Sequence, residues 1–475
     1  MSERRHKASL ATLRTARPRK QAPGRTHPVM LPTDPEVSRR FGRELRASMR
    51  LDLNGLATFQ CLNKIKEIEL RRKVADGGRV RVAFFLDSIA KFTGANVYRA
   101  MRENPLFEPF VALYSLEETC LTDDVYWRKW QQECRTLTDM GYEVFPGYDA
   151  NRHYIPLELY RPDIVFVSPF YLDPCAIHCT NTLMNINFLV CQLNYGFNIC
   201  NSYEYHYNNR RINTAWKYFV SLYDDFRELT HYSLHYGVNA VFAGSPRMDD
   251  YAKPLEQCSL PAKIDNGRPI VIYAPHWTIR FHVNVHDLGT FDLYHEYFLN
   301  MVRQNPDVNF VFKPHPSLES AVVSKGVMSL ERYRAYVAEW DSLPNGLHVF
   351  DGDYIDLFRK SSLLITDSAS FILEWLPSGH PCLYLGNPRR TEADFLAGFE
   401  PPARRVLRRY SLCWNTTEID ACFARLLRDG NDPQREARAA LTRELFPNLG
   451  RAARSIVNYL EILLDKAPPY PVSAD

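Results

Sequence analysis

The stretch VNFVFKPHP, residues 308–316, begins the region of the sequence that decides the fold. Three segments of the same kind follow it: LHVFDG at 347–352, LLITDSASFILEW at 363–375 and PCLYLGN at 381–387. Each starts with an apolar run of strand length and continues into polar, Gly or Pro residues, and helical patterns separate the segments. This alternation predicts repeated βαβ units around a parallel sheet, in which ligands bind beyond the carboxyl ends of the strands.

The first of these strand ends carries a cation and an imidazole. Lys313 and His315 follow the strand, and Pro314 and Pro316 stiffen the loop that holds them. A fixed cation beside a fixed imidazole suits a diphosphate better than it suits packing. We therefore expect Lys313 and His315 to face a phosphate group.

The third strand ends in a turn of small polar residues, Thr366, Asp367, Ser368 and Ser370, before a helix predicted to begin near Phe371. Free N–H groups at the helix start, the helix dipole and the Ser hydroxyls together favour an anion. The alternative is purely structural, because Ser368 or Ser370 is also a good N-cap.

The rest of the chain shows the same alternation of strands and helices. Residues 50–76 have helical spacing, and residues 253–269 form a polar, Pro-containing linker. The predicted strands of the first set are 80–86, 109–115, 142–147, 163–169, 186–193 and 218–223; the second set begins at 238–244 and 269–275. Helical patterns follow at 417–429, 433–446 and 450–466, and no strand is predicted after Arg390.

The 475 residues, 45% of them hydrophobic, suffice for two or three domains. Their charge is unevenly distributed, since residues 1–50 hold 13 Lys and Arg against 4 Asp and Glu, and the remainder holds 45 against 51. We predict a disordered basic tail over 1–50, which either binds an anionic membrane surface or stays solvated without a partner. The net acidic remainder argues against nucleic acid as a partner.

No apolar run of membrane-spanning length and no signal peptide is visible in the sequence. The 11 cysteines are scattered without zinc spacing, which favours reduced thiols in a cytoplasmic protein. His282 and His286 are four residues apart, as metal ligands on a helix are, but no Glu accompanies them. We therefore predict no metal site and no cofactor, and consider packing the better reading for the pair His178 and Cys179.

The KPHP motif and the later TDSAS motif resemble those of the CDP-glycerol glycerophosphotransferase family, whose members build teichoic acids and related capsule polymers. Two further elements match in the family's order: YAPHWT at 273–278 and GSPRMD at 244–249. The resemblance implies a GT-B architecture, with two Rossmann-like domains facing a cleft, a helical C-terminus and the basic tail. We place a helical lead-in at 51–78, an acceptor domain at 79–240 and a donor-nucleotide domain at 241–475.

The resemblance also implies roles for residues of the cleft. Arg247 would reach a donor phosphate, although an ion pair with Asp249 or Asp250 is an equally ordinary use. Glu374 would receive ribose hydroxyls, unless it only complements a helix dipole. The family's usual catalytic His is absent, because Tyr195 stands at its place, and a phenol with a pKa near 10 is a poor base.

We expect Lys313 and protonated His315 to neutralise departing CMP while an acceptor hydroxyl attacks the donor phosphoryl group. His276 is the first candidate for the base and Tyr195 the second. The acceptor would be the hydroxyl end of a polymer or lipid-linked chain. Two rival interpretations remain: a glycosyltransferase that uses a CMP- or UDP-sugar, and a non-catalytic nucleotide-binding partner in an assembly.

Overall fold

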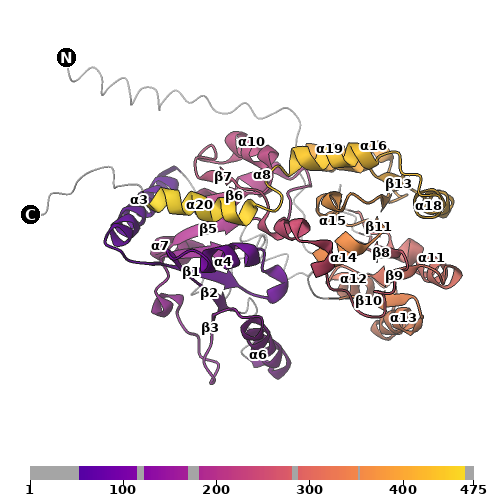
Figure 1. Ribbon diagram of the computed structural model, residues 1–475, viewed down its shortest axis with the longest axis horizontal. Coiled ribbons are helices and arrows are strands. Elements are labelled where there is room, and N and C mark those ends of the chain that lie inside the picture. Colours follow the sequence, from indigo (N-terminus) through magenta and orange to yellow (C-terminus); the bar gives the residue numbers. More distant parts are fainter. Residues whose placement is uncertain (1–52, 115–121, 169–180, 281–286, 351–353, 466–475) are drawn as a thin grey trace, which may run out of the picture.

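The computed structural model describes residues 53–114, 122–168, 181–280, 287–350 and 354–465. These residues form two α/β domains that lie side by side, each built on a parallel sheet (Figure 1). The predicted fold class, two Rossmann-like domains with a helical C-terminus, is confirmed. The basic tail and the residues His178, Cys179, His282 and His286 lie outside the described residues.

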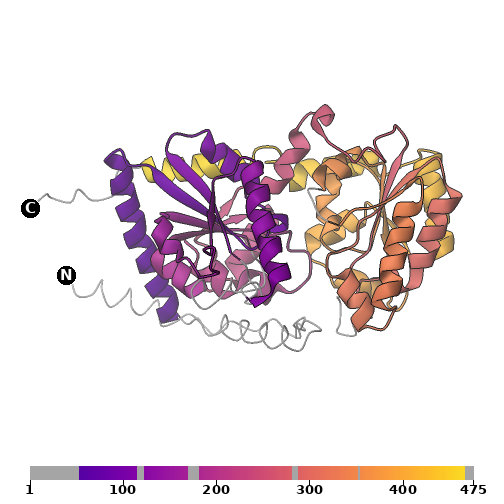
Figure 2. The same cartoon turned by 90° about the horizontal axis from the view of Figure 1, so that it is seen from below.

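The first sheet has seven parallel strands in the order β3-β2-β1-β4-β5-β6-β7. They are β1 (Val80–Leu86), β2 (Phe107–Leu113), β3 (Val144–Pro146), β4 (Ile164–Val167), β5 (Leu189–Leu193), β6 (Lys217–Val220) and β7 (Ala240–Phe242). The helices are α3 (Leu53–Ala75), α4 (Ala95–Arg102), α6 (Asp124–Asp139), α7 (Asn181–Asn187), α8 (Tyr203–Tyr207), α9 (Arg210–Thr214) and α10 (Tyr223–Tyr232). Figure 2 shows α3 on the outer side of this domain and α6 on the side that faces the second domain.

The second sheet has six parallel strands in the order β10-β9-β8-β11-β12-β13. They are β8 (Ile270–Ala274), β9 (Asn309–Phe312), β10 (Gly346–His348), β11 (Leu363–Thr366), β12 (Cys382–Leu385) and β13 (Ser411–Cys413). The helices are α11 (Phe291–Gln304), α12 (Leu318–Ser324), α13 (Leu330–Ser342), α14 (Ile355–Lys360), α15 (Phe371–Glu374), α16 (Glu392–Ala397), α17 (Pro401–Leu407), α18 (Thr416–Phe423), α19 (Arg435–Leu445) and α20 (Ala452–Asp465).

The strands read as continuous apolar runs because both faces of each sheet are covered. All five residues of β8 and all four residues of β11 are buried, as expected for parallel strands between two layers of helices. In each sheet the chain order reverses beside the first strand, between β1 and β4 and between β8 and β11. Ligands of open α/β sheets bind at such switch points, beyond the carboxyl ends of the strands.

Three details differ from the sequence prediction. The strand predicted at 238–244 pairs with β6, so it completes the first sheet and does not open the second. A strand after Arg390 was not predicted, yet β13 pairs with β12. The helix after the TDSAS turn begins at Phe371 as predicted but is a single turn, so it contributes little dipole.

The C-terminal helix α20 crosses back to the first domain, where it packs against α3 and α4 (Figure 1). Its apolar face, which includes Ile456 and Leu460, joins the core of the first domain. Asp249 caps the helix by accepting hydrogen bonds from the backbone N–H groups of Ala452 and Ala453, at 2.9 and 2.8 Å. The terminal helices therefore do not all belong to the second domain.

A second connection joins the domains near α17. The backbone N–H of Glu400 donates to the carbonyl of Ile199 at 2.7 Å, and that of Asn201 donates to Gly398 at 3.0 Å. These bonds and α20 help to fix the two domains to one another. Among the described residues, no helix is both long and apolar enough to cross a membrane.

Candidate active site

Two motifs that lie far apart in the sequence meet at the carboxyl edge of the second sheet. His276 follows β8 and His315 follows the neighbouring strand β9, and their ring centroids are 5.2 Å apart in an edge-to-face arrangement. The backbone N–H of His315 donates to the carbonyl of Pro275 at 3.0 Å, which ties the two loops together. The structure thus brings the predicted pair of imidazoles to one point beyond the strand ends.

His315 is held in one orientation by its own loop. Its Nδ1 accepts a hydrogen bond from the backbone N–H of Ser317 at 3.0 Å, so the proton of the neutral ring lies on Nε2. Burial, and next the charge of Lys313, lowers the pKa of His315 to about 4. The ring is therefore neutral at neutral pH before a ligand binds.

Asp367 braces the loops at the strand ends, because both of its carboxylate oxygens accept hydrogen bonds from groups of the protein. One carboxylate oxygen accepts from the backbone N–H of His276 at 2.5 Å, and the other accepts from the N–H and hydroxyl of Thr290 at 2.6 and 2.8 Å. Burial raises the pKa of Asp367 to about 6. Thr366 is likewise internal, since its hydroxyl donates to the carbonyl of Ala274 at 2.6 Å.

The two serines of the same turn have different surroundings. Ser368 is buried, and its backbone N–H donates to the hydroxyl oxygen of Thr366 at 2.9 Å. Ser370 is exposed, and its side chain makes no capping bond to the helix that follows. The capping alternative is thus not seen for Ser370.

A cluster of charged and aromatic side chains lies between the two domains, beside the imidazoles. The hydroxyl of Tyr354 donates to Glu374 and accepts from Arg247 Nη1 at 3.1 Å. Lys313 Nζ lies 5.5 Å from the centroid of the Tyr354 ring. Burial raises the pKa of Glu374, while the charges of Arg247 and then Lys313 oppose that shift. Among the residues that the structure describes here, two cations, Arg247 and Lys313, thus act on the carboxylate of Glu374.

Arg247 links this cluster to the first domain. Its Nη2 donates to the carbonyl of Ala90 at 3.0 Å, and its guanidinium lies 5.8 Å from the centroid of the Tyr195 ring. Burial disfavours its charge, but Tyr354 and Glu374 outweigh this effect and raise the pKa of Arg247. The ion pair with Asp249 or Asp250 considered from the sequence is not seen, because Asp249 caps α20 and Asp250 pairs with Lys253.

The loop after β5 is where the resemblance implies a catalytic histidine. The side chain of Asn194 turns into the first domain and accepts a hydrogen bond from the hydroxyl of Tyr218. Tyr195 is 37% exposed, and a Cβ placed on Gly196 would lie 3.9 Å from Glu374 Oε1. The loop therefore presents Tyr195 and the backbone of Gly196 to the cluster on the second domain.

Glu374 was predicted from the sequence as a residue of the site, whereas its partner Tyr354 was not. Glu374 is the last residue of α15, and because that helix is a single turn it still lies in the first turn, as the helix-dipole alternative requires. The contact between Glu374 and Tyr354 is partly buried, and binding of the ribose hydroxyls by Glu374 stays a prediction. Tyr354 was not predicted, because nothing in the sequence DGDYIDLF at 351–358 distinguishes a residue of the site from one of the core. The donor-binding and catalytic roles of the predicted residues stay predictions.

Residues 196–391 match the family model described as CDP-glycerol:poly(glycerophosphate) glycerophosphotransferase. The match includes Arg247, His276, Lys313, His315 and Glu374 and leaves out the strands from β1 to β5. The resemblance drawn from the motifs is therefore confirmed over that segment. No curated protein matches the chain in sequence.

Solved structures of two kinds of protein resemble most of the two-domain chain. A UDP-N-acetylglucosamine 2-epimerase has a TM-score of 0.50 and 14% identity over 84% of this chain and 99% of its own. The S. aureus MnaA–UDP complex has a TM-score of 0.49 and 14% identity over 82% and 99%. A variant of the wall teichoic acid polymerase TagF has a TM-score of 0.49 and 11% identity over 90% and 97%. At these identities the epimerase comparison shows the GT-B-like fold alone.

Proposed function

We propose that this protein is a phosphotransferase that moves a glycerol-phosphate group from CDP-glycerol to a hydroxyl of a teichoic acid- or capsule-type polymer, with release of CMP. The family match over residues 196–391 supports the donor and the reaction type. The observation that carries the proposal is the convergence of Lys313, Arg247, His276 and His315 at the cleft edge of the second sheet. Fixed cations and hydrogen-bond donors of this kind are what a diphosphate requires.

The donor diphosphate lies against Lys313 and Arg247, with Ser368 and Ser370 at its edge. An acceptor hydroxyl, at the end of a polymer or lipid-linked chain, enters from the first domain and attacks the phosphorus of the glycerol phosphate. The phosphorus–oxygen bond to CMP breaks, and Lys313 neutralises the charge that develops on the leaving phosphate. The acceptor proton passes to a base.

His315 is neutral before the donor binds, because its pKa is lowered to about 4. A bound diphosphate brings negative charge beside the ring and raises that pKa, so the imidazole takes up a proton and then supports the leaving CMP. His276 is the first candidate for the base, since its ring stands 5.2 Å from that of His315. Tyr195 is the second candidate, from the opposite side of the cleft.

We also propose that the protein works in the cytoplasm at the inner face of the cell membrane. The 13 Lys and Arg among residues 1–50 support this placement, because each basic residue near an anionic surface contributes about 1 kcal/mol. Such a surface would also carry the acceptor if that acceptor is lipid-linked.

The test of the donor site is calorimetry with CDP. Lys313→Ala and Ser370→Ala should each weaken CDP binding by about 1–3 kcal/mol, the usual cost of a lost charge-assisted bond. Lys64→Ala is the matched control, since Lys64 is exposed on α3, far from the cleft. Unchanged affinity in both site variants would place the donor elsewhere.

The test of the reaction is release of CMP in the presence of a glycerol-phosphate polymer. CDP-glycerol should be turned over in preference to CMP- and UDP-sugars. Preference for a nucleotide sugar would identify a glycosyltransferase instead. Tight CDP binding without turnover of any donor would identify the non-catalytic assembly partner.

A further inference from the structure

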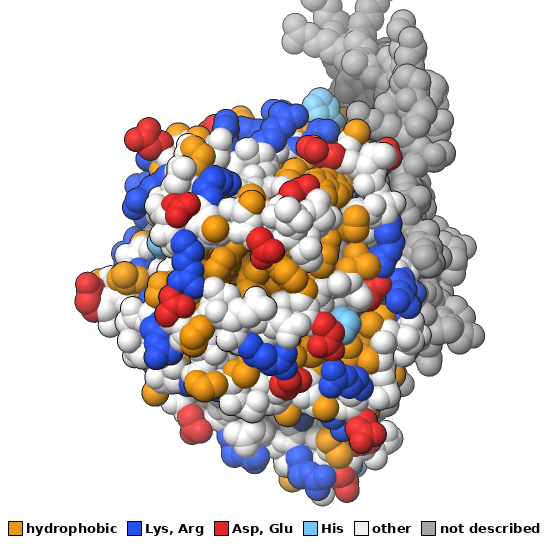
Figure 3. Space-filling view, turned by 90° about the vertical axis from the view of Figure 1, so that its right-hand side faces the viewer, with side chains coloured by type: hydrophobic (Ala, Val, Ile, Leu, Met, Phe, Trp, Pro, Cys, Tyr) orange, Lys and Arg blue, Asp and Glu red, His pale blue; other side chains and the backbone are white. Residues whose placement is uncertain are grey.

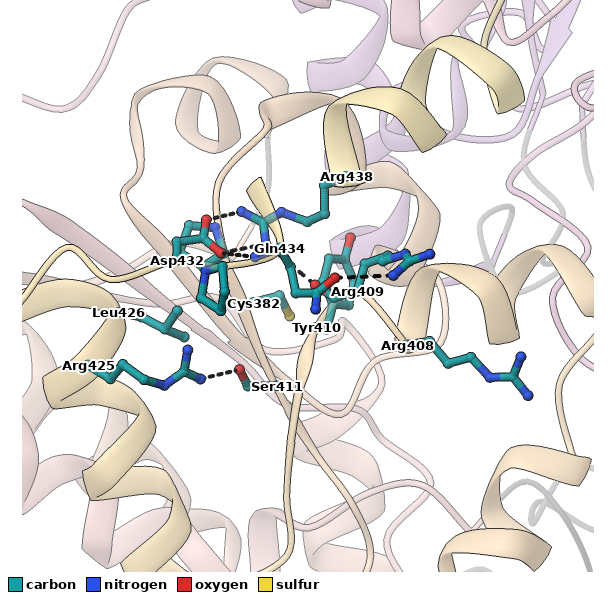
Figure 4. Close-up of a pocket in the computed structure, with 12 residues that line it drawn as sticks. Cys382, Arg408, Arg409, Tyr410, Ser411, Arg425, Leu426, Asp432, Gln434 and Arg438 are labelled. Atoms are coloured by element: carbon teal, nitrogen blue, oxygen red, sulfur yellow. Dashed lines mark hydrogen bonds and ion pairs between the residues drawn. The ribbon is translucent and has the colours of Figure 1, made fainter. Parts of the chain in front are cut away.

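A cavity of about 190 Å³ in the second domain is lined by the residues drawn in Figure 4. It is lined at the amino ends of two neighbouring strands, where Cys382 begins β12 and Ser411 begins β13. The candidate active site lies beyond the carboxyl ends of strands in the same parallel sheet. The cavity is therefore a separate place, which the proposed reaction does not use.

Arginine side chains give the cavity a positive charge. Arg438 is 1% exposed, and both of its Nη atoms donate to the carboxylate of Asp432. Arg409 donates to Gln434 Oε1 at 3.2 Å, and Arg425 donates to the hydroxyl of Ser411 at 3.0 Å. Neither of these two has an acidic partner among the described residues. The residues that line the cavity thus include four arginines, Arg408, Arg409, Arg425 and Arg438, and a single acidic residue, Asp432.

One buried donor at this cavity is also left over. The Nε–H of Arg438 has no hydrogen-bond partner among the described residues, although the side chain is almost fully buried. A buried N–H without an acceptor is costly, and native proteins rarely leave one unmatched. The side chains of Arg409 and Arg425 also line this cavity. The surplus of positive charge and the unmatched N–H donor together favour a ligand with several acceptor oxygens.

We propose that this cavity binds a small phosphate-bearing anion through Arg409, Arg425 and Arg438. Guanidinium groups match the geometry of phosphate oxygens, and a cavity of about 190 Å³ is smaller than the roughly 300–1,000 Å³ pockets of drug-sized ligands. Basic and acidic side chains alternate over the outer end of the second domain (Figure 3). That face of the molecule shows no continuous basic surface of the kind that an extended polyanion would need.

The experiment is a titration of the full-length chain with inorganic diphosphate, repeated in a Lys313→Ala background so that the cleft does not contribute. Arg425→Gln and Arg409→Gln should each weaken binding about tenfold or more while the melting temperature in the absence of ligand stays near that of the parent. Arg408→Gln is the matched control, because Figure 4 shows the Arg408 side chain directed away from the other arginines. It should change the dissociation constant by less than about twofold.

Two probes distinguish the source of the phosphate. We expect inorganic diphosphate to bind more strongly than a glycerol-phosphodiester oligomer, and the reverse order would contradict the assignment to a small anion. Both titrations are independent of donor turnover, so failure of the proposed reaction would not affect them. Equal affinity in Arg425→Gln and the parent, or crystals soaked in tungstate without density at Arg438, would overturn the assignment.

Discussion

The contact between the domains contains two buried carboxyl groups that share one tyrosine, and this arrangement predicts a pH-dependent stability. The hydroxyl of Tyr207 lies 2.7 Å from Glu400 Oε2 and 2.9 Å from Asp225 Oδ1. A phenol has only one proton to donate, so one of the two carboxyl groups must carry a proton of its own. Both side chains are almost fully buried, Glu400 at 2% and Asp225 at 1% exposure.

The other donors indicate which carboxyl group carries that proton. Asp225 also accepts from the backbone N–H of Leu222 and from the amide of Asn198, each at 3.1 Å. Glu400 has one further contact, with His206 Nδ1 at 3.1 Å. Asp225 is therefore the better stabilised carboxylate, and we infer that Glu400 is protonated and donates to Tyr207, which donates to Asp225.

Burial is the main cause that raises the pKa of Glu400 well above its ordinary value, and the carboxylates of Glu228 and Asp224 add to it. Burial, and next Glu400, raises the pKa of Asp225 to about 7. The folded protein then holds a proton that the unfolded chain releases above about pH 4.5. Stability from this group is complete below that value and is lost as the pH rises toward the folded pKa. The loss is at most about 1.4 kcal/mol per pH unit, or about 3 kcal/mol between about pH 5.5 and 7.5.

Glu400→Gln tests this reasoning, because the amide can still donate to Tyr207 and accept from His206 but has no proton to lose. Unfolding midpoints measured across that pH range should fall in the parent and change much less in Glu400→Gln. Glu436→Gln, at an exposed position of α19, should follow the parent. Parallel curves for the parent and Glu400→Gln would refute the shared proton.

Three further predictions concern the cleft and the tail. His315→Gln should bind CDP within about tenfold of the parent but lose about 100-fold or more in turnover, since Gln cannot carry the proton. Turnover within a few-fold of the parent would mean that His315 has a structural role only. Tyr354→Phe removes the hydroxyl that joins Arg247 to Glu374, so donor turnover should fall roughly tenfold with a small change in melting temperature. Unchanged kinetics would show that the contact of Tyr354 with Arg247 and Glu374 does not contribute to the reaction. Deletion of residues 1–50 should leave the melting temperature nearly unchanged and reduce binding to anionic vesicles at low salt, and equal vesicle binding would remove the membrane role.

The strands were predictable because the sheets are parallel and buried on both faces. Val80–Leu86 and Leu363–Thr366 are apolar runs whose burial follows directly from their composition. Ser411–Cys413 escaped prediction because a three-residue strand after Arg408 and Arg409 leaves no apolar run. The strand Ala240–Phe242 was predicted, but its sheet could not be, since strand pairing depends on the packing of the whole chain.

The candidate site residues that could be predicted are those that lie together in the loop after a single strand. Lys313 and His315, or Ser368 and Ser370, are recognisable because Pro and small polar residues interrupt an apolar pattern. The role of Asp367 was not recognisable, because its partners His276 and Thr290 lie 91 and 77 residues away in the chain. Tyr354 is similar, since its importance comes from Arg247 and Glu374, which reach it only in the folded protein.

The replacement of the expected histidine by Tyr195 changes how the two domains would share the chemistry. Asn194 is bonded inward to Tyr218, and the guanidinium of Arg247 lies 5.8 Å from the Tyr195 ring, so this loop helps to hold Arg247 across the cleft. The two imidazoles His276 and His315 both stand on the second domain. If proton transfer depends on that pair, the first domain contributes mainly the position of the acceptor. Proton transfer and donor binding would then be properties of the same sheet edge, fixed relative to each other by the bond from His315 to the Pro275 carbonyl.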